Sequence, residues 1–188
     1  SREHFQHVKN RLKPGGVFVQ WLPLYQISEN EFGIITHTML SVFPQVGLWR
    51  GNFQPGAEMV ALIGHQDNTP IPACGQDVER DKQNAVAGAT HLDMQELMLP
   101  INPQTILLFY CGNLTLADDL FAAYPLNTDD RPVIEFGTPK SLHRTKDQDK
   151  PQFVGAKFAD LVDQIQSRTP PSSDPLLAAR SPSSRELP

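Results

Sequence analysis

The chain has 188 residues, 16 basic and 21 acidic side chains, and a formal net charge of -5. With 39% hydrophobic residues and 12 glycines, its composition is that of a globular protein and not of a disordered one. No apolar run approaches the ~18 residues that a bilayer-spanning helix needs, and an acidic balance without basic clusters argues against a nucleic-acid partner. Two distant cysteines, Cys74 and Cys111, suit a reducing compartment, so we expect a cytoplasmic domain.

The first part of the chain predicts a helix followed by a buried strand. Phe5, Val8 and Leu12 recur at helical spacing, and the helix should end at Pro14, which two glycines follow. The run Val17 to Leu22 is almost continuously apolar, which is typical of a strand buried on both faces of a parallel sheet. Helix, sharp turn and buried strand together indicate an α/β unit.

The start of the next helix carries the clearest local signal in the chain. Ser28 and Glu31 have the spacing of a capping box. Ile27 and Phe32 occupy the two positions of a hydrophobic staple, in which one apolar residue on each side of the cap packs on the other. The helix should end before Pro44, which cannot continue it.

Further along, strand and helix patterns alternate. Val46 to Arg50 and Met59 to Ile63 are expected to pair as an antiparallel hairpin. Residues 65 to 87 lose the apolar pattern and are expected to form a surface connection. Asp93 to Leu99 predicts a short helix, whereas Thr105 to Cys111 is compatible with either a strand or a buried helix.

The following stretch predicts a helix, a polar turn and a strand. Thr115 to Tyr124 is expected to be helical, with Thr115 and Asp118 in capping positions. Asn127 to Pro132 is a polar turn, and Val133 to Phe136 predicts a short strand.

Beyond residue 140 the composition changes. Residues 141–166 predict a linker and an amphipathic helix that carries Val154, Phe158 and Ile165 on its apolar face. Residues 167–188 are rich in serine and proline and are expected to be disordered. The sequence therefore divides into residues 1–140, the linker with its helix, and the tail.

Several motifs in the same order carry a resemblance to a known family. The chain resembles the C-terminal half of bacterial spermidine synthase-like proteins, and most of all the long forms in which a membrane region precedes the synthase-like domain. The motifs are Leu12 to Tyr25, Val42 to Pro44, Leu48 to Phe53 and Pro125 to Pro132. The resemblance implies the C-terminal half of a class I S-adenosylmethionine methyltransferase-like Rossmann sheet, with an antiparallel hairpin at its edge.

For the function, the resemblance implies aminopropyl transfer from decarboxylated S-adenosylmethionine to a polyamine. In this family the glycine-rich loop that holds the nucleoside, and the aspartate that accepts the proton of the attacking amine, lie upstream of the matching segment. No Gly-x-Gly-x-x-Gly occurs here, and the chain begins with Ser1 and not with Met. We therefore expect a cut chain whose partner is the missing N-terminal half of the domain, and which alone binds no cofactor and is inactive.

A missing N-terminal half has a structural consequence. The strand Val17 to Leu22 would then have an unpaired apolar edge, and self-pairing to a homo-oligomer is expected.

The same resemblance suggests substrate-binding residues. Gln20 matches a glutamine near the polyamine, although a strand-end amide bonded to neighbouring backbone is an equally good interpretation. Trp21 and Tyr25 follow it and could line a pocket or cover the core. Phe53 replaces a substrate-contacting tyrosine, or else is a loop aromatic packed on the core.

Asp129 and Asp130 form a carboxylate pair that could attract a cationic amine, or that caps a turn beside Arg131. The classical Gln-Gly-Glu of the family reads Gln20, Trp21, Leu22 here, so one carboxylate is missing.

Two other function classes remain open. A noncatalytic binding or assembly module could keep the same fold, and a methyltransferase could use ordinary S-adenosylmethionine. A metal centre is not expected, because His4 and His7 share a helix face without a third ligand.

Overall fold

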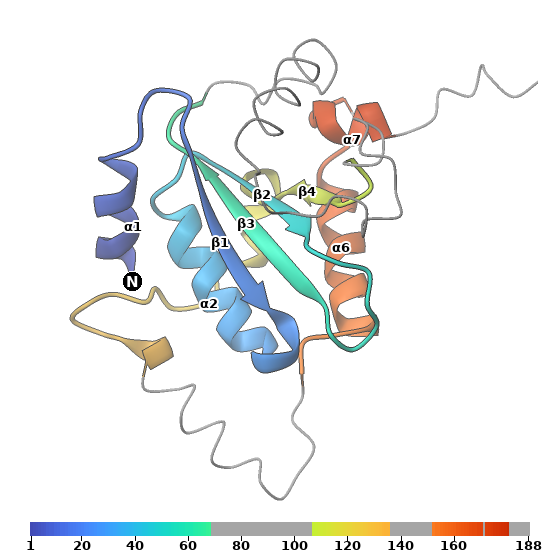
Figure 1. The fold of residues 1–188 in the computed structure, drawn as a ribbon, viewed down its shortest axis with the longest axis horizontal. Helices are drawn as coiled ribbons and strands as arrows, with labels where there is room; N and C mark the ends of the chain where they lie inside the picture. Colours follow the sequence, from blue (N-terminus) through green and yellow to red (C-terminus); the bar gives the residue numbers. More distant parts are fainter. Residues whose placement is uncertain (69–106, 136–151, 171, 181–188) are drawn as a thin grey trace, which may run out of the picture.

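The computed structural model describes residues 1–68, 107–135, 152–170 and 172–180, and these form a mixed α/β structure around one antiparallel sheet. The sheet has four strands in the order β1-β3-β2-β4 (Figure 1). The strands are β1 (Val17–Pro23), β2 (Gln45–Arg50), β3 (Met59–His65) and β4 (Tyr110–Asn113). Each neighbouring pair is antiparallel, so β1 and β2 run parallel to each other on either side of β3.

Helices pack beside and behind this sheet (Figure 1). The α-helices are α1 (Arg2–Lys9), α2 (Glu29–Leu40), α6 (Ala156–Arg168) and α7 (Pro175–Arg180). Two 3-10 helices, η1 (Leu24–Gln26) and η2 (Leu114–Leu120), connect them to the strands. Within these described residues, no helix is long and apolar enough to span a membrane.

The start of α2 confirms the capping-box prediction. The Ser28 hydroxyl accepts a hydrogen bond from the Glu31 N–H at 3.3 Å, and the Ser28 N–H donates to the Glu31 carboxylate at 2.8 Å. α1 is shorter than predicted because it ends at Lys9, three residues before Leu12. Leu12 nevertheless packs against the core. Its apolar side chain therefore indicated a buried position, and it did not indicate that the helix continues to residue 12.

The predicted strand at Val17 to Leu22 exists, but its predicted burial on both faces of a parallel sheet is wrong. β1 pairs antiparallel with β3, and its burial alternates along the strand. Phe18 and Leu22 face the helices, whereas Val17, Val19 and Trp21 are 46%, 39% and 53% exposed on the opposite face. The apolar run arises because both faces carry apolar side chains, although only one face is covered by the described residues.

The hairpin of β2 and β3 is confirmed, with Arg50 opposite Val60 and Gln45 opposite His65. It does not lie at the sheet edge as expected. β3 also pairs with β1, and β2 also pairs with β4, so the hairpin forms the middle of the sheet. A Cβ atom added at Gly64 of β3 would lie 2.6 Å from the ring of Phe43. Phe43 follows α2, so the segment after this helix packs closely on the hairpin.

The run at Thr105 to Cys111, for which the sequence left strand and helix open, contains both a turn and a strand in its described part: residues 107–109 end a helical turn, and β4 begins at Tyr110. The helix that follows is 3-10 in type. Asn113, and not Thr115, caps η2: its side chain accepts a hydrogen bond from the Thr115 N–H at 2.9 Å. The Thr115 hydroxyl instead accepts from the Val46 N–H on β2, also at 2.9 Å. The short strand predicted at Val133 to Phe136 is wrong over residues 133–135, which form a helical turn.

The C-terminal part is more ordered than its composition predicts. The amphipathic helix exists as α6, which places Phe158 and Ile165 in the core. Residues 167–188 were expected to be disordered, yet they include the last residues of α6 and all of α7. Leu176 and Leu177 of α7 are buried in a small cluster with Leu107 and Tyr110, beside Trp49.

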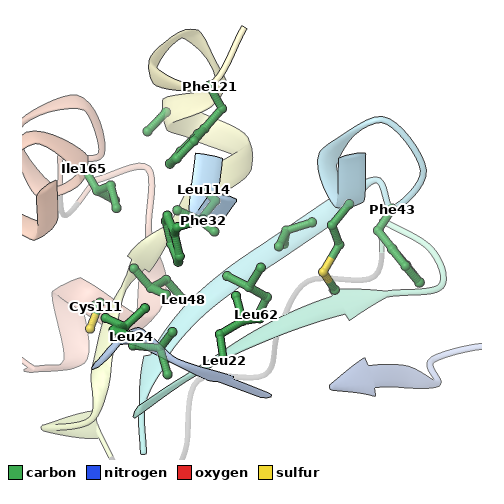
Figure 2. Close-up of a cluster of buried hydrophobic side chains, with 14 of the residues drawn as sticks. Leu22, Leu24, Phe32, Phe43, Leu48, Leu62, Cys111, Leu114, Phe121 and Ile165 are labelled. Carbon is green, nitrogen blue, oxygen red and sulfur yellow. The ribbon is translucent and has the colours of Figure 1, made fainter. Parts of the chain in front are cut away.

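The main core lies between the sheet and α2, η2 and α6. Figure 2 shows side chains from all of these elements converging on Leu48 and Leu62 at the centre of the sheet. Phe32 of α2 packs against Phe121 and Phe153, with ring centroids 6.3 and 5.1 Å away. The core thus ties segments far apart in the sequence to the central hairpin.

Some predictions concern residues outside the described part of the chain. These are the surface connection beyond residue 68, the helix at Asp93 to Leu99, the linker at 141–151, Cys74, Phe136 and the last eight residues.

One titratable side chain on the sheet gives a pH prediction. Burial lowers the pKa of His65 below its usual 6.5, and nearby Asp67 opposes this shift. The unfolded chain therefore binds more protons here than the folded chain as the pH falls below about 6.5, and stability should fall in that window. Because the group is half exposed, we expect a loss of less than about 1 kcal/mol between about pH 7.5 and about pH 5.5. Urea unfolding of His65→Asn should show a flatter pH dependence than the parent chain; an equal slope would contradict this role.

Candidate functional site

A cavity of about 180 Å³ lies where α1, β1 and α2 meet the turn that follows η2. Its wall includes Gln20 of β1 and Thr38 of α2, because even-numbered residues of β1 face the helices. The remaining lining residues are Ser1, His4, Phe5, Leu22, Ile35, Asn127, Ile134 and Glu135. The lining combines apolar side chains with polar ones that come from the α1 end of the chain, β1, α2 and the turn after η2.

Gln20 makes the backbone bond of one sequence interpretation and also lines the cavity, so its position is compatible with the other. Its side-chain amide donates to the Trp21 carbonyl oxygen at 3.1 Å, which is the backbone bond expected of a structural glutamine. The same side chain also lines the cavity. Its amide oxygen makes no hydrogen bond within the described part of the chain, so it remains available as an acceptor.

Asn127 fixes the turn that closes the cavity. Its buried side-chain oxygen accepts from the Ile134 N–H at 3.1 Å, and its side-chain amide donates to the Glu135 carboxylate at 3.3 Å. Its backbone N–H donates to the Thr38 hydroxyl on α2 at 2.9 Å. The bond to Ile134 satisfies a backbone N–H at the start of the helical turn at 133–135.

Glu135 and Asn127 were not predicted as site residues. Glu135 is the one carboxylate that lines the cavity, as judged from the described residues. Asn127 is the first residue of the predicted polar turn, and this position could have marked it as a candidate site residue. Glu135 was hidden in an apolar stretch whose expected strand period gave no reason to place its side chain at a cavity.

The carboxylate pair predicted at Asp129 and Asp130 lies outside the cavity, on the exposed tip of the turn. The Asp129 N–H donates to the Glu3 carboxylate at 2.9 Å, and the turn is closed by the Arg131 N–H, which donates to the Thr128 carbonyl at 3.1 Å. No ion pair with Arg131 is formed among the described residues.

The three predicted aromatic residues do not converge on Gln20. Trp21 lies on the opposite face of β1 and is 53% exposed. Tyr25 is half-buried in η1 and does not line the cavity. Phe53 is exposed, packs on Phe109 with ring centroids 4.8 Å apart, and lines a different cavity of about 340 Å³ beside α6. The structure therefore brings only Gln20 of the six predicted residues into this site.

The cavity suits a small cationic group better than a nucleoside. Its volume is below the ~300 Å³ at which small-molecule pockets usually begin, which favours a small group over a whole nucleoside. The Glu135 carboxylate and the Gln20 amide oxygen are both acceptors, which an ammonium group with its three donors can satisfy. Among the described residues, no group of three possible metal ligands is found.

Comparison of the chain with protein-family models, curated proteins and solved structures finds no significant match.

Proposed function

We propose that this chain is the acceptor-side part of a spermidine synthase-like transferase domain, and that the cavity beside Gln20 holds an amino group of the polyamine. The resemblance in the motifs motivates the proposal. The element order supports it: a helix, a strand, a capped helix and an antiparallel hairpin follow one another as that resemblance implies. β1 and β2 are parallel and joined through α2, which is the α/β crossover that a Rossmann-like half sheet requires.

The observation that carries the proposal is the meeting of Glu135 with Gln20 in one small cavity. The family's Gln-Gly-Glu loses its carboxylate in this chain, and Glu135 supplies one from the turn after η2. Asn127 holds one carboxylate oxygen, and the other makes no hydrogen bond within the described residues. An ammonium group could therefore bind between Glu135 and the Gln20 oxygen through charge-assisted hydrogen bonds.

In the whole protein, the proposed reaction is transfer of an aminopropyl group from decarboxylated S-adenosylmethionine to the bound amine. The groups in this chain bind and orient the acceptor amine. They include no glycine-rich loop for the nucleoside, so the chain alone should transfer nothing. Transfer by the purified chain would contradict this assignment.

Calorimetric titration with 1,4-diaminobutane tests the amine site. Glu135→Gln removes the charge with little change in shape and should weaken binding about three- to tenfold, as expected for one exposed charge-assisted contact. Gln20→Ala should weaken it by a similar factor. Asp130→Asn is the matched control, since it removes the same charge from the exposed turn, and it should leave the affinity within about twofold. Equal weakening by Asp130→Asn and Glu135→Gln would show nonspecific attraction and contradict the site.

A further inference from the structure

The cavity of about 340 Å³ that Phe53 lines is a separate candidate site, and we call it the Arg50 cavity. Arg50 of β2 and two residues of β4, Tyr110 and Cys111, form its strand side. Its helix side is one face of α6, which Figure 1 shows beside β4. The volume lies within the ~300–1,000 Å³ that is usual for small-molecule sites. None of its described lining residues also lines the cavity beside Gln20.

An irregularity in β4 shapes the strand side of the Arg50 cavity. Leu48 pairs with Gly112 and Trp49 pairs with Tyr110, so Cys111 is an extra residue opposite β2. Such bulges bend a strand and redirect neighbouring side chains. Just beyond the bulge, the Arg50 N–H donates to a carbonyl oxygen of the other segment, that of Phe109, at 2.7 Å. The backbone of Arg50 is therefore held in place beside the cavity.

The Arg50 side chain offers unsatisfied donors. Its guanidinium carbon lies 4.8 Å from the centre of the Phe158 ring and 5.7 Å from that of the Phe53 ring. Two such cation–π contacts orient the group but leave its N–H donors unbonded. The side chain is half-buried, yet it makes no hydrogen bond and no ion pair with the described residues. An oriented guanidinium with unbonded donors is suited to bind a carboxylate through two parallel hydrogen bonds.

The helix side of the Arg50 cavity offers acceptors and a negative charge. Asp163 and Gln166 are three residues apart on α6, which places both on the face that lines the cavity. The Gln166 side-chain amide donates to the Cys111 carbonyl at 3.1 Å, and its amide oxygen accepts no hydrogen bond from the described residues. Asp163 is exposed and forms no ion pair with Arg50. The donors and the acceptors of this cavity are therefore on opposite elements and do not neutralise each other.

The Arg50 cavity also has an apolar part. Phe53 and Leu108 are 52% and 49% exposed, and both line the cavity. Half-buried Val162 of α6 adds to this surface. A ligand that covers these side chains removes apolar area from water, which favours binding. The cavity therefore suits a ligand that has an apolar portion beside its charged groups.

We propose that the Arg50 cavity binds a small zwitterion with an apolar side chain, which is the chemistry of an apolar α-amino acid. The ligand carboxylate accepts hydrogen bonds from Arg50, and the ligand ammonium donates to Asp163 and to the Gln166 oxygen. The ligand side chain packs on Phe53 and Leu108. A plain anion would leave the Asp163 charge beside it, and a plain cation would meet the Arg50 charge, so a ligand with both charges is favoured over either.

Calorimetric titration of the chain with L-phenylalanine tests the carboxylate contact. We expect saturable binding with a dissociation constant at or below about 1 mM. Arg50→Gln should weaken it at least about tenfold, because the bidentate contact is lost. Arg131→Gln is the matched control, since it removes the same charge from an exposed turn, and it should leave the affinity within about twofold. If Arg50→Gln does not fold, Arg50→Lys keeps the charge without the planar fork and should still weaken binding at least about threefold.

The ammonium contact is tested with 3-phenylpropanoate, which has the same ring and carboxylate but no amine. The parent chain should bind it at least about threefold more weakly than L-phenylalanine. Asp163→Asn should weaken L-phenylalanine binding about three- to tenfold and should not weaken 3-phenylpropanoate binding. Asp160→Asn removes the same charge from α6 at a residue that does not line this cavity, and it should change neither affinity by more than about twofold.

Three results would overturn the inference. They are no saturable binding of L-phenylalanine up to about 10 mM, equal weakening by Arg50→Gln and Arg131→Gln, and equal effects of Asp163→Asn on the two ligands. Glu135→Gln should leave L-phenylalanine binding unchanged, because Glu135 lines the other cavity. The inference can therefore fail separately from the proposed function.

Discussion

Phe32→Ala is expected to lower the free energy of unfolding by about 3–5 kcal/mol, the range for removing a large aromatic side chain from a packed core. Phe32 is 1% exposed and lies near the start of α2. Its ring joins Phe121, which follows η2, to Phe153, which precedes α6. A single truncation therefore loosens three segments at once.

The packing around Phe32 is not expected to close over the space that the missing ring would leave. Phe32 already lines a cavity of about 340 Å³ between α2 and α6, and the alanine variant would enlarge it. Urea unfolding measures the change, with Phe53→Ala as control, because that ring is 52% exposed and should cost less than about 1 kcal/mol. If the alanine variant does not fold, Phe32→Leu should still show an intermediate loss. Equal effects of Phe32→Ala and Phe53→Ala would contradict the proposed core.

Tyr110→Phe should destabilise the fold by about 1–3 kcal/mol, the cost of leaving a buried polar partner unsatisfied. The Tyr110 hydroxyl donates to one oxygen of the Asp174 carboxylate at 2.8 Å. The other oxygen caps α7 by accepting from the N–H groups of Leu176 and Leu177. Burial and the Asp174 carboxylate raise the pKa of Tyr110, so the phenol stays a neutral donor.

The Tyr110 bond joins β4 to the C-terminal helix, and Asp174 is only 2% exposed. Tyr25→Phe is the matched control, since the Tyr25 hydroxyl makes no hydrogen bond among the described residues, and it should change stability by less than about 0.5 kcal/mol. A double-mutant cycle with Asp174→Ala should give a coupling energy of at least about 0.5 kcal/mol. Additive losses would mean that the two side chains stabilise the fold independently.

Local signals in the sequence predicted local structure well. The capping box at Ser28 and Glu31 defined the start of α2, because its hydrogen bonds lie within one turn of helix. The hairpin of β2 and β3 followed from two apolar runs around a turn-prone loop. α7 had a comparable signal that its composition concealed: Asp174 before Pro175 is an N-cap followed by proline at the first helical position.

Burial and site geometry depend on contacts that local patterns do not contain. The run from Val17 to Leu22 is apolar on both faces, so it could not show that only one face is covered. The carboxylates of Asp129 and Asp130 were the obvious candidates for an amine, yet the bonds of the turn place them at its exposed tip. Glu135 reaches the cavity because Asn127 caps a helical turn there, and this depends on a side-chain bond that no periodicity reveals.

The amine site is tested most directly by nuclear magnetic resonance of the isotope-labelled chain titrated with 1,4-diaminobutane. The side-chain amide signals of Gln20 and Asn127 should shift together and saturate, because both amides belong to residues that line the same cavity. These shifts should be much reduced in Glu135→Gln. Shifts confined to the backbone of Asp129 and Asp130, or no saturable shift at Gln20, would contradict the proposed acceptor site.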